Sequence, residues 1–193
     1  TGWNVSANRD AGFSIVKYTG NENANQTVGH GLSQTPEIVF TKQLDGTREW
    51  TVPLLSGFST GNYLVLNDTN TLADDNNRWS SISSSTITIG ASPFTNGSGS
   101  PYISYFFHSV AGYSKVGSYV GTGAAGNSIF TGFEPAFVMF KNTNAGNVWT
   151  IFDNKRNPTN PVDLALFPNL GNAEYDYPTN GISFNTNGFT LNS

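Results

Sequence analysis

The chain has 193 residues, which is enough for one large β domain or two small ones with an apolar core. Charged residues make up only 11% and aromatic residues 13%, a balance that argues against a disordered tail. The formal net charge is −4, no basic stretch stands out and there is no cysteine, so we expect no nucleic-acid partner, no disulfide and no thiolate metal site.

In the first half of the chain, short apolar segments alternate with turn residues. Residues 36–42 predict a strand, and the loop at residues 44–47 leads into a second strand that begins near Trp50. Residues 86–89 alternate isoleucine with threonine, the period-two pattern of a half-buried strand. Residues 102–110 carry a nearly unbroken apolar run, which indicates a strand with both faces covered.

The second half predicts the same kinds of element. Residues 138–141 and 148–152 flank an Asn-rich loop and predict a hairpin. Residues 182–184 and 189–191 flank an Asn- and Gly-containing turn, and these residue types tolerate the positive φ of a tight hairpin. No segment of ten or more residues has helical apolar spacing without Gly or Pro. The longest apolar runs are far shorter than the roughly 20 residues of a membrane span, so we expect no membrane insertion.

The two halves also match each other in sequence. Residues 12–14, 18–20, 36–42, 50–51 and 86–89 match residues 112–114, 119–121, 135–141, 149–150 and 188–191. The constant order and offset indicate an internal duplication, with copies at approximately residues 12–100 and 112–193. No Ser/Gly linker separates the copies, so we predict a single β domain over residues 1–193. The predicted fold is an antiparallel, jelly-roll-like β-sandwich in which two copies of about 100 residues share one core.

Several of these stretches, in one order, also carry a family resemblance. They are residues 12–20, 28–32 with Pro36, 110–119, 132–138, 149–153, 156–158 and 187–189. Together they resemble a domain of unknown function that recurs in virion proteins of marine bacteriophages, including tail-fibre-like proteins of phages of cyanobacteria. The resemblance runs from about Gly12 to Leu191. It implies a virion location and a β-rich fold, and it brings no assigned catalytic residues.

Three tryptophans are candidates for stacking on a sugar ring. Trp50 and Trp149 lie at matching positions just after a hairpin loop, which favours packing in a core or on a sheet face over ligand contact. Trp79 has no counterpart in the other copy and follows a polar loop. Trp79 is therefore a better candidate for ligand contact than Trp50 or Trp149, although a role in capping the core is favoured over ligand contact.

The polar run before Trp79 is the second candidate for ligand contact. Asp74, Asp75 and Asn76 carry oxygens of the kind that Ca²⁺ binds, as does Asn77. The run lacks the spaced Asp/Asn/Gly ladder of a dedicated calcium loop, so a solvated turn is favoured. We predict no metal site and no cofactor. The loops that differ between the copies, residues 70–79 and 157–180, are the first places to look for function.

No catalytic constellation is evident, and we predict that the protein is not an enzyme. The two histidines, His30 and His108, form no His-x-x-x-His pair, and the chain has no Gly-x-Ser-x-Gly elbow. The 13 acidic residues offer many pairs for a glycosidase, so their presence decides nothing. In the charged run at residues 153–156, an internal ion pair is favoured over a carboxylate-binding patch.

Three functions are compatible with these observations. The leading hypothesis is a virion domain that attaches to a host-surface glycan or envelope component, as a homo-oligomer (a trimer or a repeated display) whose weak sites act together. The second is a capsid-decoration, collar or fibre-spacer protein that contacts only other virion proteins. The third is a polysaccharide-degrading enzyme, which requires two facing carboxylates in a cleft.

Overall fold

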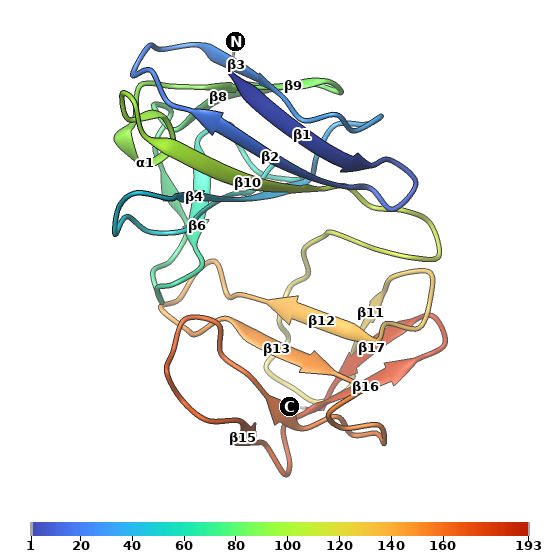
Figure 1. The fold of residues 1–193 in the computed structure, drawn as a ribbon. Helices are drawn as coiled ribbons and strands as arrows, with labels where there is room; N and C mark the ends of the chain where they lie inside the picture. Colours follow the sequence, from blue (N-terminus) through green and yellow to red (C-terminus); the bar gives the residue numbers. More distant parts are fainter. Residues whose placement is uncertain (1, 193) are drawn as a thin grey trace.

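The computed structural model describes residues 2–192 and is almost entirely β, with 40% of the chain in strands and 2% in helix. The strands form several antiparallel sheets, which make up an upper and a lower half in Figure 1. This confirms the predicted all-β class and is compatible with a β-sandwich. The helix α1 (Pro93–Asn96) is a single turn capped by the Ser92 side chain. Within residues 2–192, no helix has the length and apolar character to cross a bilayer.

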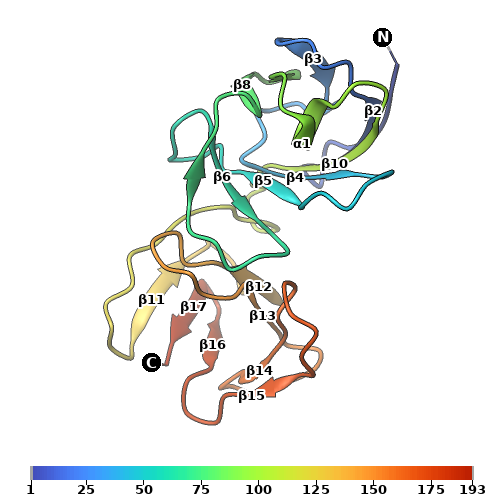
Figure 2. The same cartoon turned by 90° about the vertical axis from the view of Figure 1, so that its left-hand side faces the viewer.

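The N-terminal half contains two sheets. Its strands are β1 (Trp3–Asn8), β2 (Phe13–Thr19), β3 (Gln26–Gly29), β4 (Ile38–Gln43), β5 (Thr51–Pro53), β6 (Asn62–Val65), β7 (Ala73–Asp74), β8 (Trp79–Ile82), β9 (Thr86–Ile89) and β10 (Pro101–Phe107). Seven of them form one sheet in the order β1-β2-β10-β4-β5-β6-β7, and β3, β9 and β8 form the second. Figure 2 shows the smaller sheet above the larger one, with α1 beside them.

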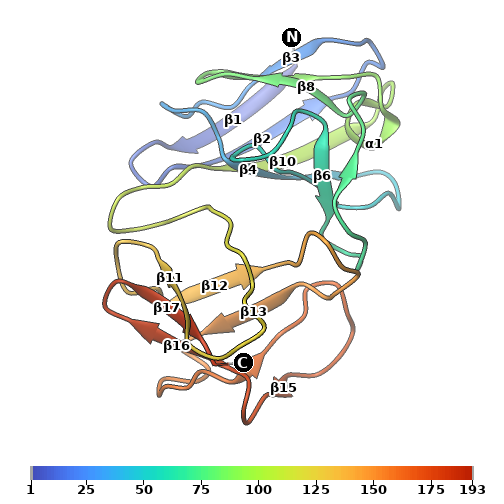
Figure 3. The same ribbon diagram turned by 180° about the vertical axis from the view of Figure 1, so that it is seen from behind.

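The C-terminal half is divided into smaller sheets. Its strands are β11 (Asn127–Phe130), β12 (Phe137–Phe140), β13 (Thr150–Asp153), β14 (Leu164–Ala165), β15 (Tyr175–Asp176), β16 (Ile182–Asn185) and β17 (Gly188–Leu191). β11, β17 and β16 form a three-stranded sheet, while β12 pairs with β13 and β14 with β15. Figure 3 shows the segment between β10 and β11 descending from the upper half and crossing the lower one.

The predicted hairpins form where the sequence places them. β4 and β5 pair at Thr41 and Thr51, and β12 and β13 pair along residues 137–140 and 150–153. β16 and β17 pair along residues 182–185 and 188–191. In each case the turn residues lie between two apolar strands, so local sequence alone determines the pairing.

The strand β10 differs from its prediction. Its buried side chains are Tyr102, Ser104 and Phe106, and the alternate residues are only half-buried. The expectation that both faces are covered is therefore wrong for one face. The apolar run is nearly unbroken because the second face carries a row of aromatic side chains that pack on one another and cover it in part.

The apolar core consists of three clusters. The first contains buried side chains of the N-terminal half, among them Val16, Trp79 and Phe106, and the second lies within the C-terminal half. The third joins the halves, because Val52 and Leu64 pack with Trp149. The Trp149 indole Nε1 donates a hydrogen bond to the Val65 carbonyl over 2.8 Å, which fixes the ring in this junction.

Candidate functional site

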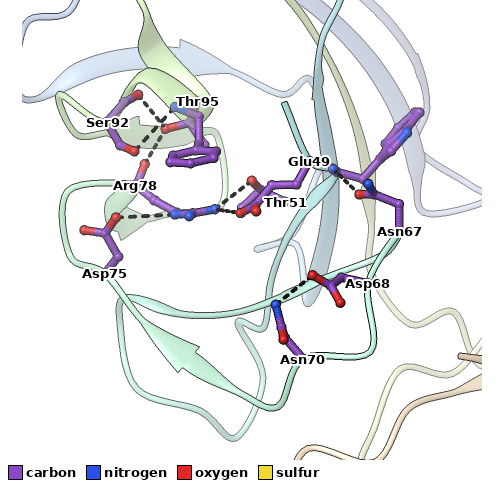
Figure 4. Close-up of polar contacts among 11 residues, drawn as sticks. Glu49, Thr51, Asn67, Asp68, Asn70, Asp75, Arg78, Ser92 and Thr95 are labelled. Atoms are coloured by element: carbon purple, nitrogen blue, oxygen red, sulfur yellow. Dashed lines mark hydrogen bonds and ion pairs between the residues drawn. The ribbon is translucent and has the colours of Figure 1, made fainter. Parts of the chain in front are cut away.

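The N-terminal half contains a buried arginine whose ion-pair partner Glu49 lines an open depression. Arg78 is only 4% exposed, and its guanidinium forms ion pairs with Glu49 and Asp75 (Figure 4). Its Nη1 also donates to Thr51 Oγ1 over 3.0 Å. A buried charge is tolerated only when it is paired and hydrogen-bonded. Thr51 on β5, Glu49 in the loop before it and Asp75 just after β7 supply both.

Aromatic rings enclose the same guanidinium. Its Cζ lies 3.8 Å from the ring centroid of Tyr63 and 4.1 Å from that of Phe94. Arg48 approaches Phe94 as well, at 5.0 Å. Cations over aromatic faces are attracted by the ring quadrupole, and the attraction is stronger where water is excluded. Burial raises the pKa of the Tyr63 hydroxyl, although the Arg78 charge opposes the shift, so this ring stays neutral.

The depression in front of this cluster has a volume of about 730 Å³. Its lining is mainly polar and consists of Gln43, Gly46, Thr47, Arg48, Glu49, Asn67, Asp68 and Phe94. Several of these side chains are held by bonds to their neighbours. Asp68 accepts from Thr69 N–H over 2.6 Å and from Asn70 Nδ2 over 2.7 Å, and Gln43 Nε2 donates to Asp45 and to Ser100. These amide and carboxylate groups are therefore held in place in advance of any ligand, whereas Arg48 is exposed.

A row of half-buried aromatic side chains adjoins this region on the sheet of β2, β10 and β4. We call Trp50, Tyr105, Phe13, Phe107 and Phe40 the aromatic row. Trp50 stacks on Tyr105 with centroids 6.2 Å apart, and Phe13 contacts both Tyr105 and Phe107. The Trp50 backbone N–H donates to Asn67 Oδ1 over 2.7 Å, and Asn67 also lines the depression. This hydrogen bond connects the aromatic row to the depression.

A family model described as a domain of unknown function (DUF7483) matches residues 2–193. The chain belongs to this family. No curated protein matches it, and no solved structure does. The DUF7483 assignment covers nearly the whole chain, including the depression, both core clusters and their junction. It thus agrees with the resemblance to a domain of unknown function and assigns no activity to any residue.

The three tryptophans that are candidates for sugar stacking lie in different environments in this DUF7483 domain. Trp79 is 2% exposed and belongs to the first core cluster, in line with the favoured capping role, so its candidacy for ligand contact is not supported. Trp149 is 3% exposed, in line with the favoured packing role. Trp50 is half-buried in the aromatic row and is the one of the three that keeps a partly open ring.

The polar run before Trp79 does not form one site. The side chain of Asp75 is used by Arg78 and by the backbone N–H of Asn77, which makes this segment a self-bonded turn. Asp74 and Asn76 are exposed. Among the described residues, no group of three acidic, histidine or cysteine side chains is placed to hold a metal ion.

The remaining charged and histidine candidates bond mainly within the molecule, although His108 Nε2 and Arg156 Nη2 have no hydrogen-bond partner among the described residues. Asp153 and Arg156 form the favoured ion pair, with 2.6 Å between Arg156 Nε and Asp153 Oδ2, and Arg156 extends the cluster to Glu174. His30 and His108 are both buried. His30 packs against Phe106 in the core, with ring centroids 5.5 Å apart and the ring planes tilted by 30°.

Most residues that line the depression were not predicted from the sequence as site residues. Gln43, Arg48, Asn67 and Asp68 are common surface residue types at the end of β4 and in two loops, and no spacing rule connects them. Arg78 directly follows the polar run of residues 74–77, but its burial depends on contacts made in the folded chain and not on a local sequence pattern. Only the matched hairpin position of Trp50 signalled this part of the molecule.

Proposed function

We propose that this domain is a non-catalytic attachment module of a phage virion and that it binds a host-surface glycan at the polar depression beside the aromatic row. The observation that carries the proposal is the mainly polar lining of amide, hydroxyl, guanidinium and carboxylate groups around about 730 Å³ of open space. The virion location rests on the family resemblance of the motifs.

The chemistry of this lining suits a sugar. Sugar hydroxyls both donate and accept, so a glycan gains from neighbouring acceptor and donor side chains, such as Asp68 and Arg48. Trp50 adds a partly open aromatic surface close to Asn67. Because the depression is open, each site would bind weakly, and attachment would depend on several sites displayed together in a homo-oligomer.

The test is binding of the purified chain to an array of bacterial surface polysaccharides, including lipopolysaccharide glycans of cyanobacteria. The double variant Arg48→Ala/Asp68→Ala removes two lining groups and is expected to reduce binding at least about tenfold, the effect of ~1.4 kcal/mol. Arg9→Ala is the matched control, since Arg9 is an exposed arginine of the same half that bonds Gly31 away from the depression. Equal binding by the double variant and the control would overturn the proposal.

A structural role in the virion is the second candidate, and a different observation favours it. Of ten exposed large apolar side chains among the described residues, eight lie between Tyr113 and Tyr175. Such a concentration is typical of a protein–protein contact. Gold-labelled antibody against this domain separates the two roles on intact particles: label at a tail or fibre tip supports attachment, and label spread regularly over the head supports decoration.

A polysaccharide-degrading activity is the least supported alternative. Glu49 and Asp68 both line the depression, but the Glu49 carboxylate is the counter-ion of Arg78 and Asp68 is bonded to its own loop. A retaining or inverting glycosidase instead needs one carboxyl free to donate a proton. Steady release of reducing ends from a bound polysaccharide by the purified chain would replace the proposal with this one.

A further inference from the structure

The strands β4 and β12 are built alike on one side. The backbone N–H of Leu55 donates to Glu37 O over 3.1 Å, and that of Asn154 donates to Ala136 O over 3.0 Å. Each acceptor immediately precedes its strand. Asn154 immediately follows β13, and Leu55 lies two residues beyond the end of β5. The inner edges of β4 and β12 are thus occupied in the same way by β5 and β13.

The outer edges then follow from the geometry of antiparallel strands. In such a strand the backbone N–H and C=O of successive residues point to opposite sides. Because the Ala136 carbonyl points toward β13, so do the polar groups of Val138 and Phe140. The N–H and C=O groups of Phe137, Met139 and Lys141 therefore point away from β13, as those of Ile38, Phe40 and Lys42 point away from β5.

The outer edge of β4 is fully paired, whereas that of β12 is not. Ile38, Phe40 and Lys42 lie opposite Phe107, Tyr105 and Ile103 of β10. In the C-terminal half β12 pairs with β13 alone, and no backbone hydrogen bond within residues 2–192 reaches its outer edge. Unpaired edges of this kind are templates for another strand.

The aromatic side chains near the outer edge of β12 are also less covered than their counterparts in the N-terminal half. In the N-terminal half, Tyr18 of β2 stacks on Tyr102 of β10 at 5.2 Å and is 2% exposed. Its sequence match, Tyr119, lies in a segment without strand structure, is 38% exposed and contacts Phe140 and Phe189 edge-on. Phe137, on β12 itself, is 56% exposed. The C-terminal half therefore has the neighbours of a β10-like strand without the strand.

We propose that the outer edge of β12 accepts an extended polypeptide segment, supplied from outside residues 2–192, as an added antiparallel strand. Its chemistry follows from β10: low charge, with aromatic side chains alternating with small or polar ones, as in Pro101–Phe107. Backbone bonds to Phe137, Met139 and Lys141 supply the affinity, and contact with the rings of Tyr119 and Phe140 selects the aromatic positions. The inference is independent of glycan binding, because it concerns the other half of the molecule.

The probe is a synthetic peptide with the sequence of residues 101–109, flanked by lysines for solubility and labelled for fluorescence anisotropy. It is expected to bind the full chain saturably and to slow amide hydrogen exchange at Phe137, Met139 and Lys141 at least about tenfold, because new strand bonds protect these groups. A control peptide with proline in place of Ser104 cannot donate there and is expected to bind at least about tenfold more weakly.

Two chain variants locate the site. Phe137→Pro removes an outward N–H while leaving the bonds to β13 in place, and Phe137→Ala keeps that N–H and removes only the ring. We expect the proline variant to lose peptide binding and the alanine variant to retain most of it, with circular dichroism confirming that both fold. Absence of saturable binding to the wild-type chain, or binding that Phe137→Pro leaves unchanged, would overturn the proposal. It would also be overturned if the free chain self-associates through this edge, with slow exchange that Phe137→Pro abolishes, because the occupant is then a second copy.

Discussion

The two halves of the molecule use the same polar anchors in the hairpins β4–β5 and β12–β13, but within residues 2–192 only β4 pairs with a further strand on its outer edge. The ammonium groups of Lys42 and Lys141 each donate to two carbonyl oxygens of the loop that follows, at 2.7 and 2.9 Å and at 2.8 and 3.2 Å. The backbone N–H groups of Trp50 and Trp149 donate to Asn67 and Asn169. These matched bonds support the predicted duplication, which itself stays a prediction.

The difference between the halves lies in what surrounds the hairpins. In the N-terminal half, β10 and β2 extend the sheet beyond β4, and large apolar side chains are mostly covered. In the C-terminal half, β12 has an open edge and most of the exposed large apolar side chains gather. Similar hairpins can therefore form part of a larger sheet, as β4 and β5 do, or leave one strand edge unpaired, as β12 and β13 do within residues 2–192. The difference depends on whether a further strand is present.

The sharpest test of this comparison is to remove the matched tryptophans. Trp149→Ala deletes a buried ring and its hydrogen bond at the junction of the halves, and is expected to lower the free energy of unfolding by about 3–5 kcal/mol. Trp50→Ala removes a half-buried ring and is expected to cost about 1–2 kcal/mol. Urea unfolding followed by circular dichroism measures both. Equal losses would mean that the two positions are energetically equivalent despite their different burial.

The two arginine clusters provide the second comparison. Arg78→Met leaves Glu49 and Asp75 without their partner and is expected to cost about 2–3 kcal/mol, less than a fully buried pair because both carboxylates keep some exposure. Arg156→Met is expected to cost at most about 1 kcal/mol, since the Arg156 side chain is 24% exposed and that of Glu174 is 40% exposed. Thermal unfolding of both variants in low and high salt checks the order. A larger loss of unfolding free energy from Arg156→Met than from Arg78→Met would contradict this order of the two clusters.

Many of the strands and hairpins can be predicted from the sequence, and there is a physical reason why the remaining features cannot. The hairpins at β4–β5, β12–β13 and β16–β17 follow from local turn chemistry and alternation, which act within a few residues. The burial of Trp79 and Arg78 depends on contacts between strands and loops far apart in the chain, which no local pattern records. The depression likewise joins turns that only the completed sheet brings together.

Acid should affect the N-terminal half through His30. Its Nδ1 accepts from Leu32 N–H and its Nε2 donates to Ser83 O, so the folded state holds the neutral ring. Burial lowers the pKa of His30 below 6.5, and nearby His108 lowers it further, while the Ser83 carbonyl opposes the shift. The unfolded chain therefore binds this proton more readily, and stability is expected to fall as the pH drops below about 6.5.

The variant His30→Asn tests this assignment. It should be less stable at neutral pH because the core loses the ring, but its stability should change less between about pH 7 and pH 5 than that of the wild type. Chemical unfolding at a series of pH values gives both curves. Parallel curves for the two proteins would assign the pH dependence to other groups.

The smallest effect is expected on the open surface of the C-terminal half. Val120 and Phe130 are 86% and 75% exposed, so Val120→Ser and Phe130→Ser should change the free energy of unfolding by no more than about 0.5 kcal/mol. Differential scanning calorimetry measures the change. A loss of several times that size would show that these side chains are packed in solution and that the C-terminal half is less open than described.

Amide hydrogen exchange on the unmodified chain tests the contrast between the halves most directly. The account predicts slow exchange at Ile38, Phe40 and Lys42, whose outward groups face β10, and fast exchange at Phe137, Met139 and Lys141, whose outward groups face no strand within residues 2–192. Equally slow exchange at both sets in the monomeric chain would contradict it, because the outer edge of β12 would then already be paired.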